Sequence, residues 1–326
     1  METKILEDCI KKLNFTDPQV SKLKGGINSS TFKIKKDNDN ILLKIYKGRN
    51  KSERINREIT FLEESEKNDI KETPKLLGHD MRLGYSFMEW IEGRKIMKPG
   101  HKDWESIVEF LKKIQKNEIH SALLKKKIYA SEACFKVEDH LNLIKERYQL
   151  FRDTMIASKE NNEMIRETDN TYRRIEGLEE KYRSKREFGN WKYHSIVSPS
   201  DIGFHNVIRT KDKYAFIDFE YAGIDDPYKL MADLLIHPDW APSARDISQI
   251  TTSTQKYILK DKINNHRLRF MLAIYQLKWI TIIYNTANKC HSSEQRDQFL
   301  SKLLKYNKDS EDRIRCASIE FDSRQK

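Results

Sequence analysis

Apolar and polar residues follow one pattern before residue 93 and another after it. In the first part, short apolar stretches are separated by turn residues, such as the run Asp37–Asn40, as is typical of a small antiparallel sheet. Apolar residues at helical spacing predict one helix there, over residues 51–66. We predict five strands around it, at residues 20–23, 31–35, 41–46, 74–77 and 85–91.

Helical periodicity dominates after residue 93. No proline occurs between Gly100 and Pro199, so that stretch has few helix breakers. The last third is predicted to be helical, with an apolar stripe from Leu268 to Ile283 in the core. The other predicted elements are helices at residues 104–116 and 228–235, a strand at 213–219, and an antiparallel helix pair within 141–186 that turns near residues 160–170.

This order of elements predicts an α+β protein of two domains. A small domain, residues 1–92, would hold the five-stranded antiparallel sheet and its helix, and a larger, mainly helical domain would occupy residues 93–326. A helical insertion is expected at about residues 120–190. Dimerisation, coverage of a substrate site and a spacer role are all open for this insertion.

The chain is basic, but its positive charge is dispersed. Lys and Arg number 61 against 50 Asp and Glu in 326 residues, which gives a net charge of +11. A nucleic-acid-binding protein usually concentrates its basic residues on one element or arm, so we expect no nucleic-acid partner. A dispersed surplus fits general solubility and a preference for anionic small substrates.

Cysteine usage and hydropathy predict a cytoplasmic protein. The four cysteines, Cys9, Cys134, Cys290 and Cys316, lie far apart and lack zinc-ligand spacing, as is typical of reduced thiols. The N-terminal residues lack the apolar run of a signal peptide. The longest apolar stretch, Phe270–Tyr284, is interrupted by polar residues and is too short to span a membrane.

Four features that carry chemistry occur in a fixed order. They are the segment Gly25-Gly26-Ile27-Asn28-Ser29-Ser30, the pair Lys44 and Glu58, the pair Asp201 and Asn206, and Asp218. Each taken singly has an ordinary explanation: a turn between strands, a structural ion pair, a spacing that arises by chance, or a helix cap. Their order is what points to one reaction.

Phosphoryl transfer requires a cover over the phosphates, a fixed cation, metal ligands and a group that orients the attacking hydroxyl. Lys44 would be the cation, and Glu58 its acidic partner, because a lysine buried in a strand needs one. Asn206 and Asp218 offer oxygen ligands for Mg²⁺, and Asp201 is left to accept the hydroxyl proton. Their spacing is that of a kinase catalytic loop followed by its metal-binding aspartate. The nucleotide cover would be formed by Gly25, Gly26, Asn28, Ser29 and Ser30.

The chain resembles the aminoglycoside phosphotransferase and choline kinase superfamily, the small-molecule relatives of protein kinases. The resemblance extends over about residues 15–290 and is carried by Ser198-Pro199-Ser200-Asp201-Ile202-Gly203-Phe204-His205-Asn206, by Ile217–Pro227 and by Leu230–Leu234. It implies a bilobal protein-kinase-like fold, ATP and Mg²⁺ as cofactors, and transfer of the γ-phosphoryl group to a hydroxylated small molecule: a sugar, an amino sugar or an amino alcohol such as choline. It also implies that the connector at residues 87–91, with Met88, Glu89 and Trp90, binds adenine through its backbone.

The chain departs from the family pattern at two places. Pro199 stands two residues before Asp201, where the family usually has a histidine, and His205 lies after Asp201, so it is not the same group. The segment from Gly25 to Ser30 also lacks a strict G-x-G-x-x-G. Its polar side chains would therefore cover the phosphates by hydrogen bonds.

The acceptor is less well defined by the sequence. Glu220, Asp225 and Asp226 place carboxylates near the expected cleft and would suit an amine-bearing or polyhydroxyl substrate, although Asp225 and Asp226 would equally cap the next helix. A protein kinase and a catalytically inactive kinase-like binding module are the alternative functions. The short distance from Asp218 to Pro227 leaves no room for an activation segment, and the complete set of chemical residues argues against inactivity.

Overall fold

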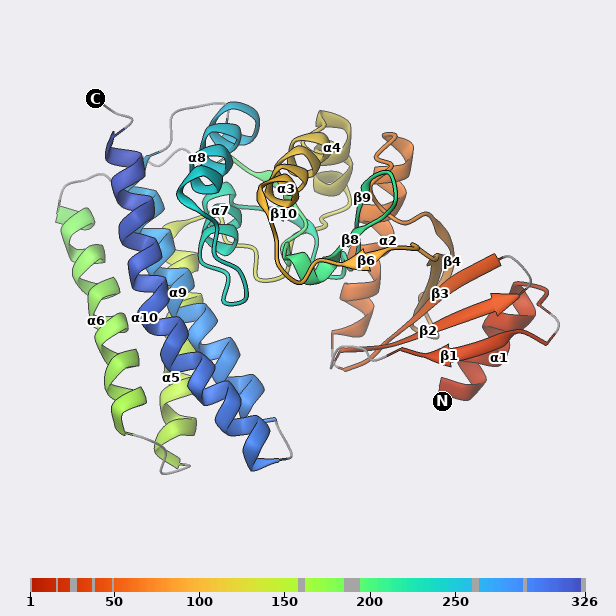
Figure 1. Cartoon of the computed structure of the whole chain (residues 1–326), viewed down its shortest axis with the longest axis horizontal. Coiled ribbons are helices and arrows are strands. Elements are labelled where there is room, and N and C mark those ends of the chain that lie inside the picture. The colour runs from red at the N-terminus through yellow and green to blue at the C-terminus, as the bar shows by residue number, and fades with distance from the viewer. Residues whose placement is uncertain are drawn as a thin grey trace. The chain divides into compact units, whose positions relative to one another are not determined.

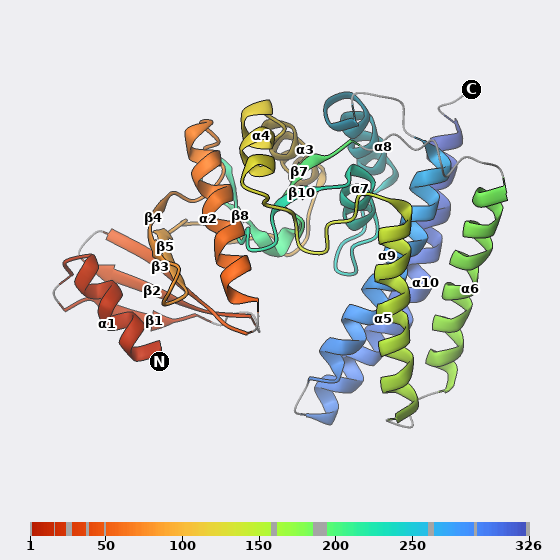
Figure 2. The same cartoon turned by 180° about the vertical axis from the view of Figure 1, so that it is seen from behind.

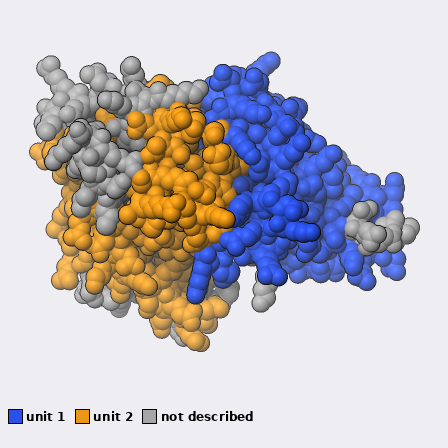
Figure 3. All heavy atoms as spheres, turned by 45° about the horizontal axis from the view of Figure 1, so that its top comes forward, with its two compact units in different colours: residues 1–98, 113–131, 197–224 blue, residues 99–112, 132–196, 225–326 orange. Residues whose placement is uncertain are grey.

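A computed structural model of the chain describes residues 2–15, 17–23, 28–36, 39–48, 50–157, 162–184, 194–259, 264–289 and 292–323. The chain forms two compact units, each assembled from three segments (Figure 3). Unit 1 comprises residues 1–98, 113–131 and 197–224, and unit 2 comprises residues 99–112, 132–196 and 225–326. The domain boundary expected after residue 92 stays a prediction.

Unit 1 contains the predicted five-stranded antiparallel sheet, in the order β1-β2-β3-β5-β4 (Figure 1). Its strands are β1 (Gln19–Lys22), β2 (Ser29–Lys36), β3 (Asp39–Tyr46), β4 (Leu76–Asp80) and β5 (Tyr85–Glu89). The register places Lys44 of β3 opposite Thr31 of β2 and Ser86 of β5. Because side chains alternate between the faces of a strand, Lys44 and Ile45 point to opposite faces.

One helix packs on each face of this sheet. α1 (Glu2–Lys12) packs Ile5 into a cluster with the apolar side chains of β2, β3 and β5. α2 (Lys51–Lys67) packs Ile55 against Tyr46 on the opposite face. The sequence predicted α2 but not α1, so the expectation of a single helix beside the sheet was wrong.

Several short elements complete unit 1. A three-stranded antiparallel sheet consists of β6 (Arg94–Lys95), β8 (Val207–Arg209) and β9 (Tyr214–Phe216). The remaining elements are the paired strands β7 (Ile196–Ser198) and β10 (Gly223–Asp225), helix α4 (Asn117–Lys125) and the 3₁₀ turn η2 (Phe204–Asn206). Only β9 was predicted among these strands, because strands of two or three residues show no periodicity.

Unit 2 is built mainly of long helices in the part that the structure describes. α5 (Val137–Ala157), α6 (Asn162–Ser184), α9 (Asn265–Ala287) and α10 (Ser293–Ser323) lie side by side (Figures 1 and 2). The α9 stripe is buried as predicted, except that Trp279 is half-buried. Residues 162–170 were predicted to lie in the turn of the helix pair, but they belong to α6. Arg166 and Asn170 are exposed whereas Thr168 is buried, so polar residues in this part of the helix occur on more than one side of it and do not mark a loop.

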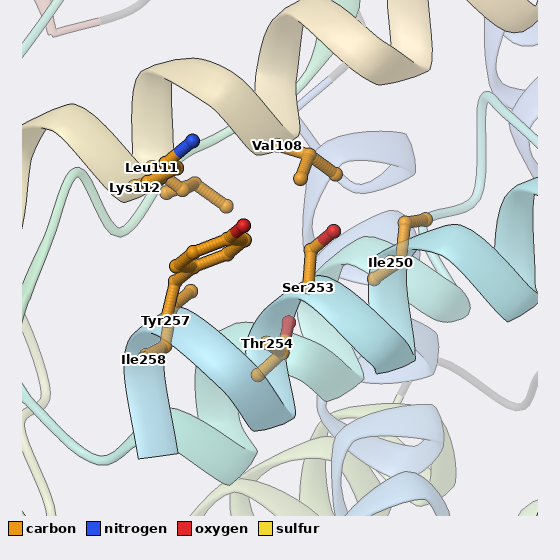
Figure 4. A pocket seen from close by; sticks show the side chains of 8 residues that line it. All are labelled: Val108, Leu111, Lys112, Ile250, Ser253, Thr254, Tyr257 and Ile258. Atoms are coloured by element: carbon orange, nitrogen blue, oxygen red, sulfur yellow. The ribbon is translucent and has the colours of Figure 1, made fainter. Parts of the chain in front are cut away.

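Three shorter helices lie mainly in unit 2. They are α3 (His101–Ile114), α7 (Pro227–Leu235) and α8 (Ala244–Ser253), which continues into the π-helical turn η3 (Thr254–Leu259). Tyr257 reaches from η3 toward α3, where the Lys112 ammonium lies 4.5 Å from its ring centroid (Figure 4). None of the helices described here combines the length and the apolarity that a membrane crossing needs.

Candidate active site

The ammonium of Lys44 is the centre of a buried charge cluster in unit 1. Its Nζ lies 2.8 Å from Glu58 Oε2, 2.5 Å from Asp218 Oδ1 and 3.0 Å from Glu220 Oε2. The Lys44 side chain is only 4% exposed, so the loss of hydration must be offset by these carboxylates. The predicted pair of Lys44 with Glu58 is confirmed, and it is joined by two further acidic groups.

The electrostatics keep Lys44 charged. Burial by itself would lower the pKa of Lys44, but the carboxylates of Glu58 and Asp218 raise this pKa well above its ordinary value. Burial raises the pKa of Glu58, and the neighbouring ammonium of Lys44 opposes that rise. The cluster therefore presents a fixed positive charge beside the more open carboxylate of Asp218, whose side chain is 41% exposed.

Glu58 is held in place from several directions. The Tyr46 hydroxyl donates to Glu58 Oε2 and lies 3.0 Å from Ser86 Oγ. The backbone N–H of Phe219 donates to Glu58 Oε1 at 3.1 Å, and the Phe219 ring stacks on Phe61 of α2 with centroids 4.4 Å apart. Helix α2 is thus fixed to the residue that directly follows Asp218.

The loop from Asp201 to Asn206 brings three polar side chains together. Asn206 Nδ2 donates to the Asp201 carbonyl oxygen at 3.0 Å and lies 3.4 Å from Asp201 Oδ2. His205 Nε2 lies 3.3 Å from the same carboxylate oxygen. The backbone N–H of Ile217 donates to the Asn206 carbonyl oxygen at 2.9 Å, which joins this loop to the segment that carries Asp218.

Two residues of these segments have left-handed backbone conformations. Ser200 has φ of 63° and Asp218 has φ of 66°. This region is uncommon for residues other than glycine, but Asp and Asn tolerate it better than most. Such conformations persist where the surrounding structure enforces them, and they cluster at functional sites. The turn at Asp218 directs its carboxylate toward Lys44.

The predicted phosphate cover is only partly described. Gly25 and Gly26 lie outside the described residues, whereas Asn28 is the first described residue after them. The Asn28 carbonyl accepts the Lys47 backbone N–H at 2.9 Å, and its side-chain Nδ2 donates to the Tyr221 hydroxyl at 2.6 Å. The end of the glycine segment is therefore attached to the chain three residues beyond Asp218.

Arg54 is a site residue that the sequence reasoning missed. Its guanidinium donates to the Asn28 carbonyl at 3.0 Å, to Glu220 Oε1 at 3.2 Å and to the Lys47 carbonyl. The side chains of Arg54 and Glu220 are 7% and 5% exposed. Arg54 lies one helical turn before Glu58, and that spacing was the available signal.

Glu220 has a different setting from the one expected. The sequence suggested that it contacts a substrate, but its carboxylate is buried between Arg54 and Lys44. Tyr221 also differs from a typical surface tyrosine, because burial and the neighbouring Glu220 raise its pKa to about 12. Glu220 and Tyr221 therefore stabilise the site through their contacts with Lys44, Arg54 and Asn28.

The two serines of the predicted cover point to opposite faces of the sheet. Ser29 is on the face of Lys44, since it pairs with Tyr46, whereas Ser30 pairs with Ile45 on the face of α1. The Ser30 hydroxyl is buried there and donates to Glu2 Oε1 at 2.8 Å. The prediction that the Ser30 side chain covers the phosphates is therefore corrected.

Glu2 of α1 contacts β1, β2 and the residue that follows β3 through one carboxylate. Besides Ser30, it accepts from Lys47 Nζ at 2.6 Å and from Lys22 Nζ at 3.0 Å. Hydrogen bonds from Lys47, Ser30 and Lys22 lower the pKa of Glu2 to about 2. In the sequence, Lys22 lies before Gly25 and Gly26 and Ser30 lies after them, so Glu2 contacts residues on both sides of the two glycines.

The predicted adenine connector continues from β5. Met88 is buried at 2% exposure. The backbone N–H of Glu89 donates to the Lys75 carbonyl at 3.0 Å, and that of Trp90 donates to the Asn40 carbonyl at 3.3 Å. These three residues stay candidates for adenine binding.

Asp225 and Asp226 belong to a separate cluster in unit 2. Asp225 is buried and forms an ion pair with Lys229 at 2.7 Å, and burial raises its pKa. Asp226 caps α7 by accepting from the backbone N–H of Tyr228 at 2.6 Å. The capping alternative is confirmed for Asp226, and the contacts of Asp225 give it a structural partner in place of a substrate.

The donor set at Asp218 suits a hard divalent cation. The carboxylates of Glu58, Asp218 and Glu220 offer oxygen atoms within 4.8 Å of one another, and Asp218 is the most exposed of the three. The side-chain Nδ2 of Asn206 donates to Asp201, which leaves the side-chain amide oxygen of Asn206 as the possible ligand atom. Carboxylate and amide oxygens are the ligands that Mg²⁺ takes, so these residues fit the expected metal.

Comparisons with known proteins agree with this geometry. The profile of the family described as "Phosphotransferase enzyme family" matches residues 19–149. No curated protein matches the chain. Among solved structures, the chain is similar to choline kinase from Cryptosporidium parvum, with 14% identity, 95% of this chain and 96% of that one covered, and a TM-score of 0.62.

Two further structures show the same likeness. Ethanolamine kinase from Plasmodium vivax shares 13% identity over 93% of this chain and 85% of its own, with a TM-score of 0.60. Spectinomycin phosphotransferase in complex with ADP and its antibiotic shares 12% identity over 96% of this chain and 98% of its own, with a TM-score of 0.63. At these identities the likeness concerns the fold, and it confirms the predicted bilobal α+β architecture of the protein-kinase-like type.

Proposed function

We infer that the protein is a small-molecule phosphotransferase, because a phosphotransferase family profile matches residues 19–149 and the fold is similar to those of choline kinase and spectinomycin phosphotransferase. We propose that it moves the γ-phosphoryl group of ATP, with Mg²⁺, to a hydroxyl group of a small molecule. The carrying observation is the contact of buried Lys44 with both Glu58 and Asp218. That contact joins three of the chemical groups that phosphoryl transfer needs.

Each residue of the cluster has a defined task in this proposal. Lys44 would hold the phosphates, because it is a permanently charged donor at a fixed position. Glu58 would keep the ammonium of Lys44 in place. Asp218 and Asn206 would bind the metal ion, which when bound neutralises phosphate charge and orients the phosphoryl group.

Asp201 would orient the acceptor hydroxyl and take its proton. Its carboxylate is 32% exposed, so it is accessible to a small molecule. Contacts with His205 and Asn206 limit the positions of the carboxylate. A positioned carboxylate of this kind contributes about 10²–10⁴-fold to a rate.

The acceptor class in this proposal depends on the named structural neighbours. Those neighbours are called choline kinase, ethanolamine kinase and spectinomycin phosphotransferase, and all of these small molecules carry hydroxyl groups. We therefore propose a sugar, an amino sugar or an amino alcohol as the acceptor. Glu220 and Asp225 do not contribute to this assignment, because both are buried in ion pairs.

A coupled assay for ADP release would test the proposed function. The purified protein would be incubated with ATP and Mg²⁺ and with a panel of amino alcohols, sugars and aminoglycosides, beside casein as a protein acceptor. We expect turnover with a small-molecule acceptor that stops on addition of EDTA and in the Asp201→Asn variant. Turnover with casein alone would identify a protein kinase. Nucleotide binding without turnover on any acceptor would favour an inactive binding module.

A further inference from the structure

The three-stranded sheet of unit 1 concentrates positive charge. In the antiparallel pairing of β6 with β8, Arg94 lies opposite Arg209 and Lys95 lies opposite Ile208. Like charges directly opposite one another destabilise a strand pair. Lys211 adds another cation in the turn after β8. The Arg209 guanidinium also lies 5.8 Å from the ring centroid of Tyr214 in β9.

A cavity opens beside these strands. It has a volume of about 670 Å³ and is lined by Glu92, Gly93, Arg94, Lys95, Ile96, Arg209, Thr210 and Lys211. This volume lies within the range of small-molecule sites. Gly93 is required in its wall, since a Cβ atom there would lie 2.5 Å from Ile208 Cγ2 and 2.6 Å from the Arg209 carbonyl oxygen. The close approach of β8 to the segment before β6 therefore depends on glycine.

Basic side chains outnumber acidic ones in the lining of the cavity. Four lining residues are basic and one, Glu92, is acidic. The Glu92 carboxylate already accepts the indole N–H of Trp90 at 2.8 Å and lies 4.0 Å from Lys33 Nζ. In the part of the chain that the structure describes, no carboxylate forms an ion pair with Arg94, Lys95 or Lys211.

We propose that this cavity binds a small polyanion with two or more phosphoryl or carboxylate groups. Arg94 and Arg209 would hold these groups, because guanidinium donors form paired, charge-assisted hydrogen bonds with them. The cavity shares no lining residue with the cluster around Lys44. The inference therefore does not depend on the proposed function. A concave site of limited volume favours a small ligand over an acidic protein segment.

Isothermal titration calorimetry with inorganic tripolyphosphate would test this proposal on the full chain, without nucleotide or Mg²⁺. The parent protein would be titrated first, and the other proteins would carry Lys44→Met, so that the candidate active site does not dominate the signal. Arg94→Gln/Arg209→Gln would then be compared with a matched control, Lys305→Gln/Lys308→Gln. The control removes two cations from exposed positions of α10.

We expect saturable binding to persist in Lys44→Met and to weaken at least about tenfold when both arginines are replaced. The matched control should change the affinity by less than about twofold, because exposed cations are screened by salt. The paired arginine variant should melt at the same or a higher temperature without ligand, since it loses a like-charge contact. If that variant does not fold, Lys95→Gln/Lys211→Gln tests the same cavity and should weaken binding at least about tenfold as well.

Three results would overturn the proposal. Loss of all saturable binding in Lys44→Met would place the only anion site at the candidate active site. Equal weakening in the arginine pair and in the matched control would mean diffuse electrostatic attraction. Tighter binding of a hexaglutamate peptide than of tripolyphosphate would identify an acidic protein segment as the occupant.

Discussion

Replacement of Arg54 by methionine tests how the candidate site is held together. The change removes the guanidinium and keeps an unbranched side chain in a buried position. It breaks the ion pair with Glu220 and the hydrogen bonds to the carbonyls of Asn28 and Lys47. The three partners, Asn28, Lys47 and Glu220, are distant from one another in the sequence of unit 1. Loss of their contacts should therefore affect both stability and nucleotide binding.

The cost follows from the burial of the two charged groups. Removal of one partner of a buried ion pair typically costs about 3–5 kcal/mol in the free energy of unfolding. We expect the lower end, because Glu220 still contacts Lys44 at 3.0 Å. The Asn28 carbonyl keeps its hydrogen bond from the Lys47 backbone N–H. The Lys47 carbonyl loses its bond from Arg54, which adds only about 1 kcal/mol to the loss of stability. Arg54→Met should therefore lose about 3–4 kcal/mol.

A double-mutant cycle with Glu220→Gln would measure the pair itself. Urea unfolding of the parent protein, both single variants and the double variant would give the coupling energy, which we expect at about 1–3 kcal/mol. In kinetic assays Arg54→Met should raise the KM for ATP more than it lowers kcat, because the lost contacts hold the end of the phosphate cover. A loss below about 1 kcal/mol, or additive effects of the two changes, would refute this account of the network.

Three further substitutions address the reaction. Lys44→Ala should abolish ATP turnover and should also lower the melting temperature, because it leaves the carboxylates of Glu58, Asp218 and Glu220 without their buried cation; normal turnover would exclude a phosphate-binding role. Asp218→Asn keeps a residue type that tolerates the left-handed backbone but should abolish Mg²⁺-dependent transfer, and an unchanged Mg²⁺ titration would remove Asp218 from the site. Asp201→Asn should bind a nucleotide analogue with near-normal affinity in calorimetry while transfer falls about 10²–10⁴-fold; equal losses of binding and stability would make Asp201 a structural residue.

The elements with clear periodicity were predictable from the sequence. The five strands and α2 follow from the spacing of apolar residues and from the turns between them. The strand predicted at residues 74–77 nevertheless shares only Leu76 and Leu77 with β4, and the one predicted at residues 85–91 extends two residues beyond β5. α1 was missed because its few apolar residues alternate with charged ones, and only packing of Ile5 against the sheet explains it. The helix pair was predicted, but its turn was misplaced because the start of α6 is polar.

The chemistry of the site was predictable in part, and the limit was the register of the strands. The pair of Lys44 with Glu58 follows from the cost of a lysine buried without a partner. The direction of the Ser30 side chain depends on whether Lys44 pairs with residue 30 or 31, which the sequence does not determine. The burial of Glu220 depends on Arg54, a residue distant in sequence that becomes a neighbour only after folding.

The contacts of Glu2 have a practical consequence for experiments on this protein. Residues on both sides of Gly25 and Gly26 are joined by Glu2, so an affinity tag fused before Met1 would lie close in sequence to a residue that contacts both flanks of the proposed phosphate cover. A nucleotide affinity measured on such a fusion would include the effect of the tag as well as the affinity of the site. A C-terminal tag, or a cleaved N-terminal one compared with its uncleaved form, would separate the two. The uncleaved form thereby becomes a probe of how firmly α1 restrains the cover.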